Sequence, residues 1–140
     1  MSRIMALDYG IRRTGIAVTD PLQIIANGLT TIDSHSLRPW LKTYFSTEAV
    51  ERVIIGLPYS LDGSETHGTK PVKDFIRLFK KDHPQIPIET VDEQYTSQLA
   101  TQSIIDSGLR KKQRANKALI DEVAATIMLQ SYLQSKQQFL

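Results

Sequence analysis

The pattern of apolar and polar residues at the start of the chain predicts three β-strands. Residues 4–7 form a continuous apolar run that ends at Asp8, which is typical of a central strand buried on both faces. Residues 14–19 are rich in β-forming residues, and the short link between the two segments favours an antiparallel hairpin. A third strand is expected over residues 28–32, after a turn marked by Asp20 and Pro21. The chain therefore opens with three strands joined by turns.

After this point the pattern alternates between helices and strands. Apolar residues recur at helical spacing from Leu37 to Phe45, with Ser36 as a candidate N-cap, and residues 52–57 then form a short apolar strand. Residues 59–70 contain glycine, serine and aspartate without periodicity, so we expect a mobile surface loop there. Four more elements follow: a helix marked by Val72, Phe75, Ile76 and Phe79, a strand over residues 86–91, a helix from Thr96 or Ser97 to Gly108, and a final helix from about Ala118.

This order of elements predicts one mixed sheet covered by helices. Three strands linked by turns, followed by βαβ units, imply a five-stranded sheet whose first three strands are antiparallel and whose last two are parallel. We therefore expect an α/β fold, and this is the element order of the ribonuclease H-like fold. No repeat or linker divides the sequence, and 140 residues with 41% apolar content suffice for one core, so we expect a single domain over residues 1–140.

Composition limits the class of protein without identifying it. With 17 Lys and Arg against 15 Asp and Glu, the net charge of +2 is too small to indicate a nucleic-acid binder by itself. The lack of cysteine excludes a disulfide scaffold and a thiolate metal site, and is typical of a reducing compartment. The apolar run before Asp8 is far shorter than the roughly 7–15 residues of a signal peptide, and no stretch approaches the ~18 of a membrane span. We expect a cytoplasmic protein that makes no membrane contact.

Acidic residues stand where two of the predicted strands end. Asp8 follows the first strand, and Asp92 and Glu93 follow the fifth. Ligands of open α/β sheets usually bind at this edge. Each acid also has a structural interpretation, because Asp8 suits an Asx turn and Asp92 or Glu93 suits a helix N-terminus. Only one of the adjacent pair can face a given side of the sheet.

A third acidic pair, Asp121 and Glu122, lies in the final helix. The helical neighbours of Asp121 are Ala124, Ala125 and Met128, so its face is apolar and narrow. Such a face can approach a sheet closely, and this approach would bring Asp121 toward the end of the first strand. Because burying an unpaired charge is costly, an acid in this position indicates a function.

The acids together predict metal-dependent phosphoryl chemistry. Hard oxygen ligands without a nearby histidine or cysteine cluster suit Mg²⁺ or Mn²⁺. Two such ions can activate a water molecule and stabilise the leaving oxygen when a phosphodiester bond is hydrolysed. We therefore expect two ions of Mg²⁺ or Mn²⁺ and a nucleic-acid substrate.

A basic segment precedes the final helix. It consists of Arg110, Lys111, Lys112, Arg114 and Lys117. These side chains, with Arg13 in the hairpin after Asp8, are candidate contacts to phosphate, although a solvated helix end has the same composition. The segment lacks spaced aromatic residues, so the substrate would be held by its backbone. His67, in the loop before the second helix, is a weaker candidate, since a lone loop histidine is usually just exposed.

Four blocks of the sequence resemble the YqgF (RuvX) family. In chain order they are Asp8-Tyr9-Gly10 with Arg13, Gly15 and Ala17; Gly56-Leu57-Pro58 with Asp62-Gly63; Asp92-Glu93 with Thr96-Ser97; and Lys117 through Asp121 to Ala124-Ala125. The resemblance implies a ribonuclease H-like fold related to Holliday-junction resolvases and a nuclease role in maturing the 5′ end of the 16S ribosomal RNA precursor. It also implies that Asp8, Glu93 and Asp121 are the catalytic residues and metal ligands. Gln94 departs from the family, which usually has arginine there.

The resemblance leaves several alternatives open. It favours Glu93 over Asp92. On the final helix, the side chains that flank Asp121 are smaller than those that flank Glu122. Asp92 and Glu122 are therefore reserve candidates. The substrate is expected to be structured precursor ribosomal RNA, with DNA junctions as the alternative and a noncatalytic nucleic-acid-binding factor as the third interpretation. The sequence is compatible with a monomer or a homodimer. An ATP-binding relative of this fold would generally need two such domains.

Overall fold

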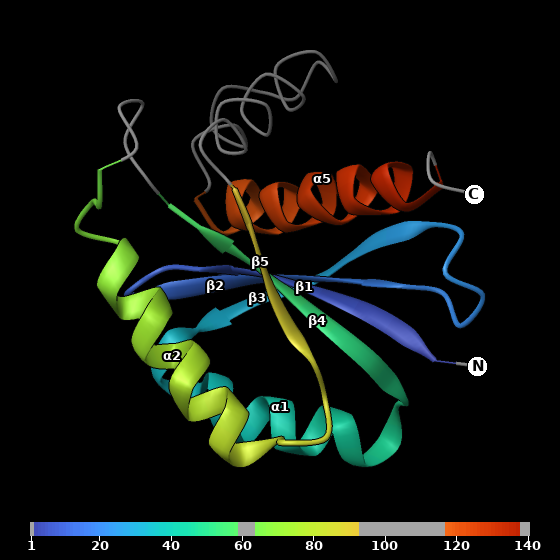
Figure 1. The fold of residues 1–140 in the computed structure, drawn as a ribbon, viewed down its shortest axis with the longest axis horizontal. Helices are drawn as coiled ribbons and strands as arrows, with labels where there is room; N and C mark the ends of the chain where they lie inside the picture. Colours follow the sequence, from blue (N-terminus) through green and yellow to red (C-terminus); the bar gives the residue numbers. More distant parts are fainter. Residues whose placement is uncertain (1, 59–63, 93–116, 138–140) are drawn as a thin grey trace.

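The computed structural model describes residues 2–58, 64–92 and 117–137 (Figure 1). Its elements are β1 (Arg3–Tyr9), β2 (Arg13–Thr19), β3 (Ala26–Asp33), the 3₁₀ turn η1 (Ser34–Ser36), α1 (Leu37–Thr47), β4 (Val50–Leu57), α2 (Thr69–Asp82), β5 (Ile88–Asp92) and α5 (Lys117–Gln137). The expected helix between Thr96 and Gly108 lies outside the described residues. No helix in the described ranges is long and apolar enough to cross a membrane.

The five strands form one mixed sheet in the order β3-β2-β1-β4-β5. β1 pairs antiparallel with β2, as does β2 with β3, whereas β4 pairs parallel with both β1 and β5. The short links after β1 and β2 permit only hairpins, and the crossovers through α1 and α2 allow parallel pairing. The predicted sheet, with its three antiparallel and two parallel strands, is confirmed.

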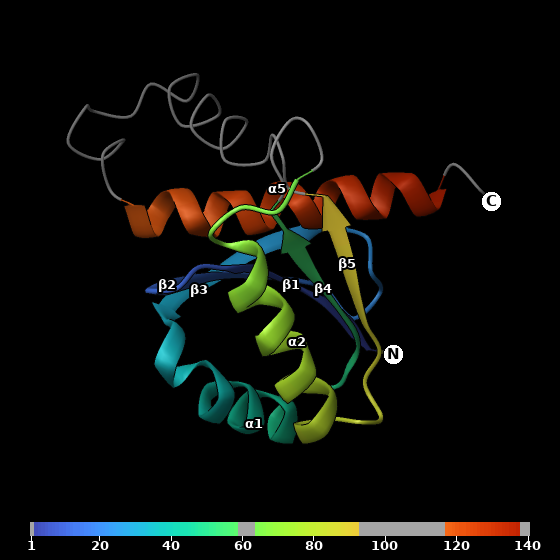
Figure 2. The ribbon, with the colours of Figure 1, turned by 60° about the vertical axis from the view of Figure 1, so that its left-hand side comes forward.

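The sheet is the middle of three layers. Figures 1 and 2 show α5 across one face and α1 with α2 on the other. Side chains of β1 alternate between the two cores, since Met5 and Leu7 belong to the α1/α2 side while Ile4 and Ala6 belong to the α5 side. This burial on both faces explains the uninterrupted apolar run that predicted the strand.

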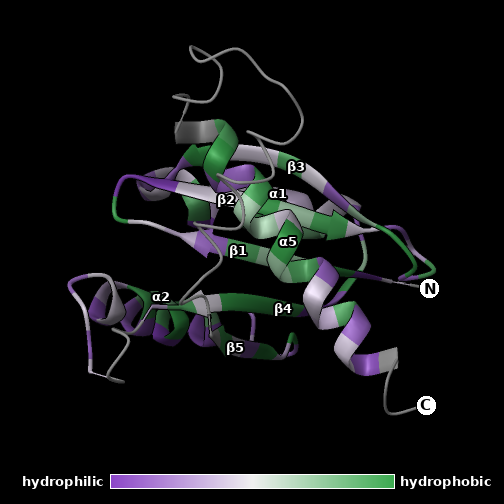
Figure 3. Ribbon diagram, turned by 90° about the horizontal axis from the view of Figure 1, so that it is seen from above, coloured by the Kyte–Doolittle hydropathy of each residue, from purple (hydrophilic) through white to green (hydrophobic). Residues whose placement is uncertain are grey.

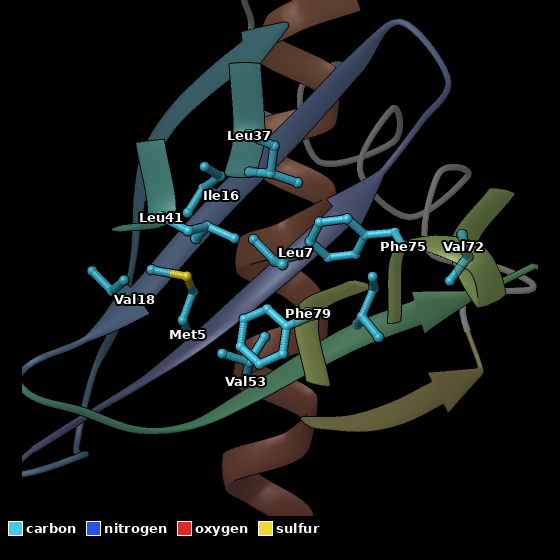
Figure 4. Packing of buried hydrophobic residues seen from close by; sticks show 11 residues of the cluster. Met5, Leu7, Ile16, Val18, Leu37, Leu41, Val53, Val72, Phe75 and Phe79 are labelled. Carbon is cyan, nitrogen blue, oxygen red and sulfur yellow. The ribbon is translucent and has the colours of Figure 1, made fainter. Parts of the chain in front are cut away.

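The two cores differ in the size of their side chains. On the α1/α2 side, Leu7 of β1 meets Phe75 and Phe79 of α2 among other large residues (Figure 4). On the α5 side, large residues such as Ile54 and Leu129 are accompanied by Ala6 and Ala17 of the sheet and Ala125 of α5. Small residues let a helix lie close to a sheet. Figure 3 shows α5 crossing the hydrophobic central strands.

Some boundaries differ from the expectation. The loop predicted up to residue 70 ends earlier, because α2 begins at Thr69, whose buried hydroxyl accepts a hydrogen bond from the Thr66 N–H at 2.9 Å and also bonds the Pro58 carbonyl. Ser36 occupies the N-cap position of α1 as expected, but its side chain makes no capping hydrogen bond. The 3₁₀ turn η1, which the periodicity of the sequence did not predict, comes directly before α1.

Candidate active site

Asp8 lies near the end of β1, on the face that α5 covers. It shares the alternation of Ile4 and Ala6, and its side chain is partly buried. Its partner position on β2 is Gly15. On β4, the other neighbouring strand, Ile55 pairs with Leu7, and Gly56 is the next residue toward the end of the strand. Asp8 is therefore flanked by glycine on both adjacent strands.

The start of α5 rests on the strand position opposite Asp8. A Cβ atom on Gly15 would overlap the Asp121 carbonyl and would lie 2.9 Å from the Glu122 nitrogen. Only glycine leaves enough space here, so this residue sets how closely the helix approaches β2. The structure thus brings Asp121 against the strand that pairs with the Asp8 strand, by way of the narrow face that the sequence indicated.

An ion pair holds the Asp121 side chain. Arg13 Nε of β2 donates to Asp121 Oδ2 at 3.0 Å, and the two side chains are 34% and 24% exposed. Arg13 lies on the same face of β2 as Gly15, two positions away. The pair therefore connects the hairpin to α5 at the edge where β1 ends.

The second acid of this helix points elsewhere. A Cβ atom on Gly28 of β3 would lie 2.6 Å from Glu122 Oε1, so the Glu122 carboxylate lies over β3, which is two strands away from β1. The two adjacent acids of α5 therefore lie over different strands. Within the described residues, no three acidic or histidine side chains are grouped closely enough to hold a metal ion.

A pocket of about 430 Å³ opens beside Asp121. It is lined by Gly10, Ile11, Arg12, Arg13, Gly68 and Asp121. These residues come from the β1–β2 turn, the residue before α2 and the first turns of α5, so the pocket lies at the sheet edge that the sequence singled out. A larger pocket of about 720 Å³, next to Arg38 and His83, shares no residue with it and contains none of the predicted site residues.

Hydrogen bonds from Ser34 hold the β1–β2 turn, which carries Arg12 and Arg13. Within the turn, the Gly10 N–H donates to the Arg13 carbonyl at 2.8 Å. The Ser34 N–H donates to the Arg12 carbonyl at 2.9 Å, and the Ser34 hydroxyl bonds the Gly10 carbonyl. Ser34 also meets the buried hydroxyl of Thr14 at 2.8 Å. The turn thus has a defined position relative to the pocket.

Tyr9 is adjacent to Asp8 but faces the other layer. Its ring stacks on Phe75 with centroids 4.9 Å apart. Burial raises the pKa of the Tyr9 phenol, and the charge of Asp74 raises it further. The phenol therefore stays protonated at neutral pH, and it is not a candidate general base.

Several predicted site residues lie outside the described residues. These are Glu93, Arg110, Lys111, Lys112 and Arg114. Lys117 is the first residue of α5, and Asp92 is the last residue of β5. His67 is exposed in the turn before α2 and does not line the pocket.

Sequence reasoning missed Arg12, Ile11 and Gly68, which also line the pocket. A signal for the first two was present, because the tip of a hairpin that follows Asp8 must lie at the same sheet edge as Asp8. Gly68 carried no comparable signal, since the path of the chain before α2 is not encoded in any periodicity.

Residues 2–135 match the RuvX family, which is described as Holliday junction resolvase. The chain belongs to this family. It is 54% identical over 136 residues to a protein of Flavobacterium psychrophilum and 52% identical over 136 residues to one of Bacteroides thetaiotaomicron. Each match covers 97% of this chain and 99% of the relative, and both relatives are named as candidate pre-16S rRNA nucleases.

Solved structures with little sequence similarity share the RuvX fold. RuvC of T. thermophilus, solved in complex with a Holliday junction substrate, superposes with a TM-score of 0.56 at 13% identity, over 99% of this chain and 97% of that one. The fowlpox virus Holliday junction resolvase gives 0.53 at 13% identity, over 95% and 99%. The expected family and ribonuclease H-like fold are confirmed. As a RuvX nuclease, the chain is a hydrolase that acts on phosphodiester bonds of nucleic acid.

Proposed function

We propose that this chain is a divalent-metal-dependent nuclease that processes the 5′ end of pre-16S ribosomal RNA in the cytoplasm. The observation that carries the proposal is the placement of Asp8 and Asp121 on one face of the sheet, at the edge where an arginine-lined pocket opens. The names of the close relatives support ribosomal precursor RNA as the substrate.

The residues present fit a hard divalent cation. Asp8 and Asp121 offer carboxylate oxygens, and the part of the pocket that the structure describes is lined by no histidine. This donor set suits Mg²⁺ or Mn²⁺. Nucleases of this family and fold generally use divalent metal ions, in agreement with the donor set.

Glu93 completes the proposed set of ligands. β5 pairs Val91 with Gly56, and the Val91 side chain packs on the α5 side of the sheet. Only one of the adjacent residues Asp92 and Glu93 can face that side of an extended chain. Because the RuvX motifs favour Glu93, we assign the third ligand to it and keep Asp92 as the reserve.

The chain contributes orientation and charge to the reaction. When bound, two divalent ions would activate the attacking water and neutralise the charge that develops on the phosphate. Asp8, Glu93 and Asp121 would hold the ions, and Arg13 orients the Asp121 carboxylate through its ion pair. Arg12 and Arg13 bind the backbone phosphates of the substrate at the rim of the pocket. Arg110, Lys111, Lys112, Arg114 and Lys117 extend this contact along the substrate.

The Asp8→Asn variant tests the proposal. It keeps the size of the side chain and removes the anionic ligand, so cleavage of a pre-16S ribosomal RNA fragment in Mg²⁺ or Mn²⁺ should be abolished. EDTA should stop the wild-type reaction, and added Mn²⁺ should restore it. Glu51→Gln is the matched control, because Glu51 is an exposed acid next to Val50, at the opposite end of β4 from the pocket. Unchanged cleavage by Asp8→Asn would refute the assignment.

A DNA-junction resolvase is the second candidate function. The description of the family and the likeness to RuvC favour it. The test uses the same protein with a four-way DNA junction and a linear duplex, and measures the mass in solution, since a resolvase of this kind would act as a dimer. Selective cutting of the junction would support this candidate, and equal or absent cutting of both substrates would exclude it. RNA binding without metal-dependent cleavage would instead favour a noncatalytic factor.

A further inference from the structure

Ile11 stands at the tip of the β1–β2 turn with its side chain in solvent. It is 69% exposed, which is the highest value among the exposed large hydrophobic residues of the described chain. Single exposed apolar residues are common on protein surfaces and usually need no explanation. This one differs because it lines the same pocket as Asp121 and is followed directly by Arg12 and Arg13.

The turn presents Ile11 in a fixed position. The carbonyls on either side of it, of Gly10 and Arg12, both accept hydrogen bonds from Ser34, which is buried. A further bond from the Gly10 N–H to the Arg13 carbonyl, at 2.8 Å, closes the turn. A rigid turn loses little conformational entropy when it binds a partner. Ile11 is therefore preorganised for contact.

We propose that Ile11 packs against a nucleobase of the substrate next to the phosphate that is cut, while Arg12 and Arg13 hold the backbone on either side of that base. The proposal rests on the nuclease function proposed above. Apolar side chains of this size insert between base steps in other nucleic-acid-binding proteins and partly unstack them. Because every base has an apolar face, such a contact selects for unpaired or easily unstacked structure and not for sequence.

Charge favours a nucleobase over an apolar protein surface as the occupant. Arg12 is exposed, and Arg13 is partly exposed beside its ion-pair partner Asp121, so any partner that covers Ile11 must also meet the Arg12 cation. A nucleic acid offers an apolar face and flanking anions at the spacing of one nucleotide, whereas an apolar protein patch would leave the Arg12 guanidinium poorly solvated. The other exposed isoleucines, Ile24 and Ile25, have no adjacent arginine in the sequence and lie in the turn at the opposite end of β2.

The experiment compares Ile11→Ala with Ile24→Ala, whose isoleucine is 61% exposed in the opposite turn. The probe is an RNA hairpin with a 5′ single-stranded extension and 2-aminopurine in the base pair that adjoins the extension. Binding is measured by fluorescence in EDTA, so that no strand is cut. We expect wild-type protein and Ile24→Ala to raise the fluorescence of the probe through unstacking.

For Ile11→Ala we expect no such rise and a Kd about fivefold to tenfold higher, the factor that follows from losing the burial of between one and two methyl-sized groups. Ile11→Leu should restore both. Because Ile11 is exposed, its substitution should leave the thermal midpoint unchanged, so a folding defect does not confuse the comparison. In cleavage assays Ile11→Ala should raise KM more than it lowers kcat, as expected for a residue that binds substrate throughout the reaction.

Equal fluorescence and equal Kd for Ile11→Ala and wild type would overturn the inference, as would binding by the wild type without any rise. Failure of the nuclease proposal would be seen differently, as absence of cleavage by the wild-type protein in Mg²⁺ and Mn²⁺. The fluorescence comparison would still decide the role of Ile11, since it needs no cleavage.

Discussion

Replacing Gly15 by alanine tests how the close approach of α5 positions Asp121. Gly15 lies within β2 and pairs with Asp8, and its backbone is one that alanine adopts without strain. The added methyl group would overlap the Asp121 carbonyl and lie 2.9 Å from the Glu122 nitrogen. Both are backbone atoms of a helix, so no side-chain rotation relieves the clash. The helix itself must move.

The size of this movement sets the expected effects. Non-bonded carbon atoms are normally about 3.5–4.0 Å apart, so the first turns of α5 would have to move away from β2 by roughly 1 Å or more. Overpacking of this kind costs about 1–3 kcal/mol in the free energy of unfolding. A displacement of about 1 Å can reduce a catalysed rate about 100-fold when it affects a positioned group. We expect Gly15→Ala to be about 2 kcal/mol less stable and to cleave RNA about 100-fold more slowly.

Gly28→Ala is the matched control, because the same helix covers the same kind of position. Its methyl group would lie 2.6 Å from Glu122 Oε1 and 3.1 Å from Thr126 Oγ1, both of which are side-chain atoms. The end of the glutamate can rotate away, so we expect a loss below about 1 kcal/mol and unchanged cleavage. Urea denaturation followed by circular dichroism gives both stabilities, provided the slope m is constant. If the two variants match in stability and in rate, the reasoning about α5 is wrong.

Two further predictions follow from charged groups. Arg13→Ala should lower the free energy of unfolding by less than about 1 kcal/mol, since its ion pair with Asp121 is partly exposed. The variant should nevertheless cleave RNA about tenfold more slowly, because the Asp121 carboxylate loses its orientation. Equal cleavage by wild type and variant would contradict this prediction. Burial of His83 beside Phe45 lowers its pKa, an effect that Asp82 partly offsets. The unfolded chain therefore binds more protons, so the stability from neutral His83 should decrease as the pH falls below about 6.5. Urea midpoints at pH 7.5 and 5.5 should show this loss in the wild type and a smaller one in His83→Phe; equal pH dependence would contradict the assignment.

The sheet was predictable from sequence because each of its pairings follows from a local constraint. The link between β1 and β2 is too short for anything but a hairpin, and the crossovers through α1 and α2 leave parallel pairing as the natural outcome. The close approach of α5 was also predictable in kind, since Ala124 and Ala125 face the sheet and are buried. The RuvX motifs added the choice of acids, which periodicity alone left open.

The contacts that define the pocket could not be predicted in the same way. The ion pair between Arg13 and Asp121 joins residues 108 positions apart, and no pattern along the chain encodes such a distance. Ser34 fixes the β1–β2 turn through its backbone N–H and hydroxyl, yet in the sequence it is one polar residue among several after β3. Long-range polar contacts depend on the tertiary arrangement, whereas strand pairing here depends mainly on the length of the links.

The asymmetry between the two faces of the sheet suggests how this fold separates stability from chemistry. The α1/α2 face is filled by large side chains such as Leu7 and Phe79, so truncation there removes much apolar contact, at about 2–5 kcal/mol for a buried leucine. On the α5 face, Gly15 opposite Asp8 touches the backbone of α5 and small residues such as Ala6 and Ala17 lie nearby, so substitutions there act by moving α5 and with it Asp121. Substitutions of equal destabilisation should therefore reduce cleavage far more when they lie beneath α5 than when they lie beneath α2. A Leu7→Ala variant compared with Gly15→Ala at equal remaining stability would separate the two effects.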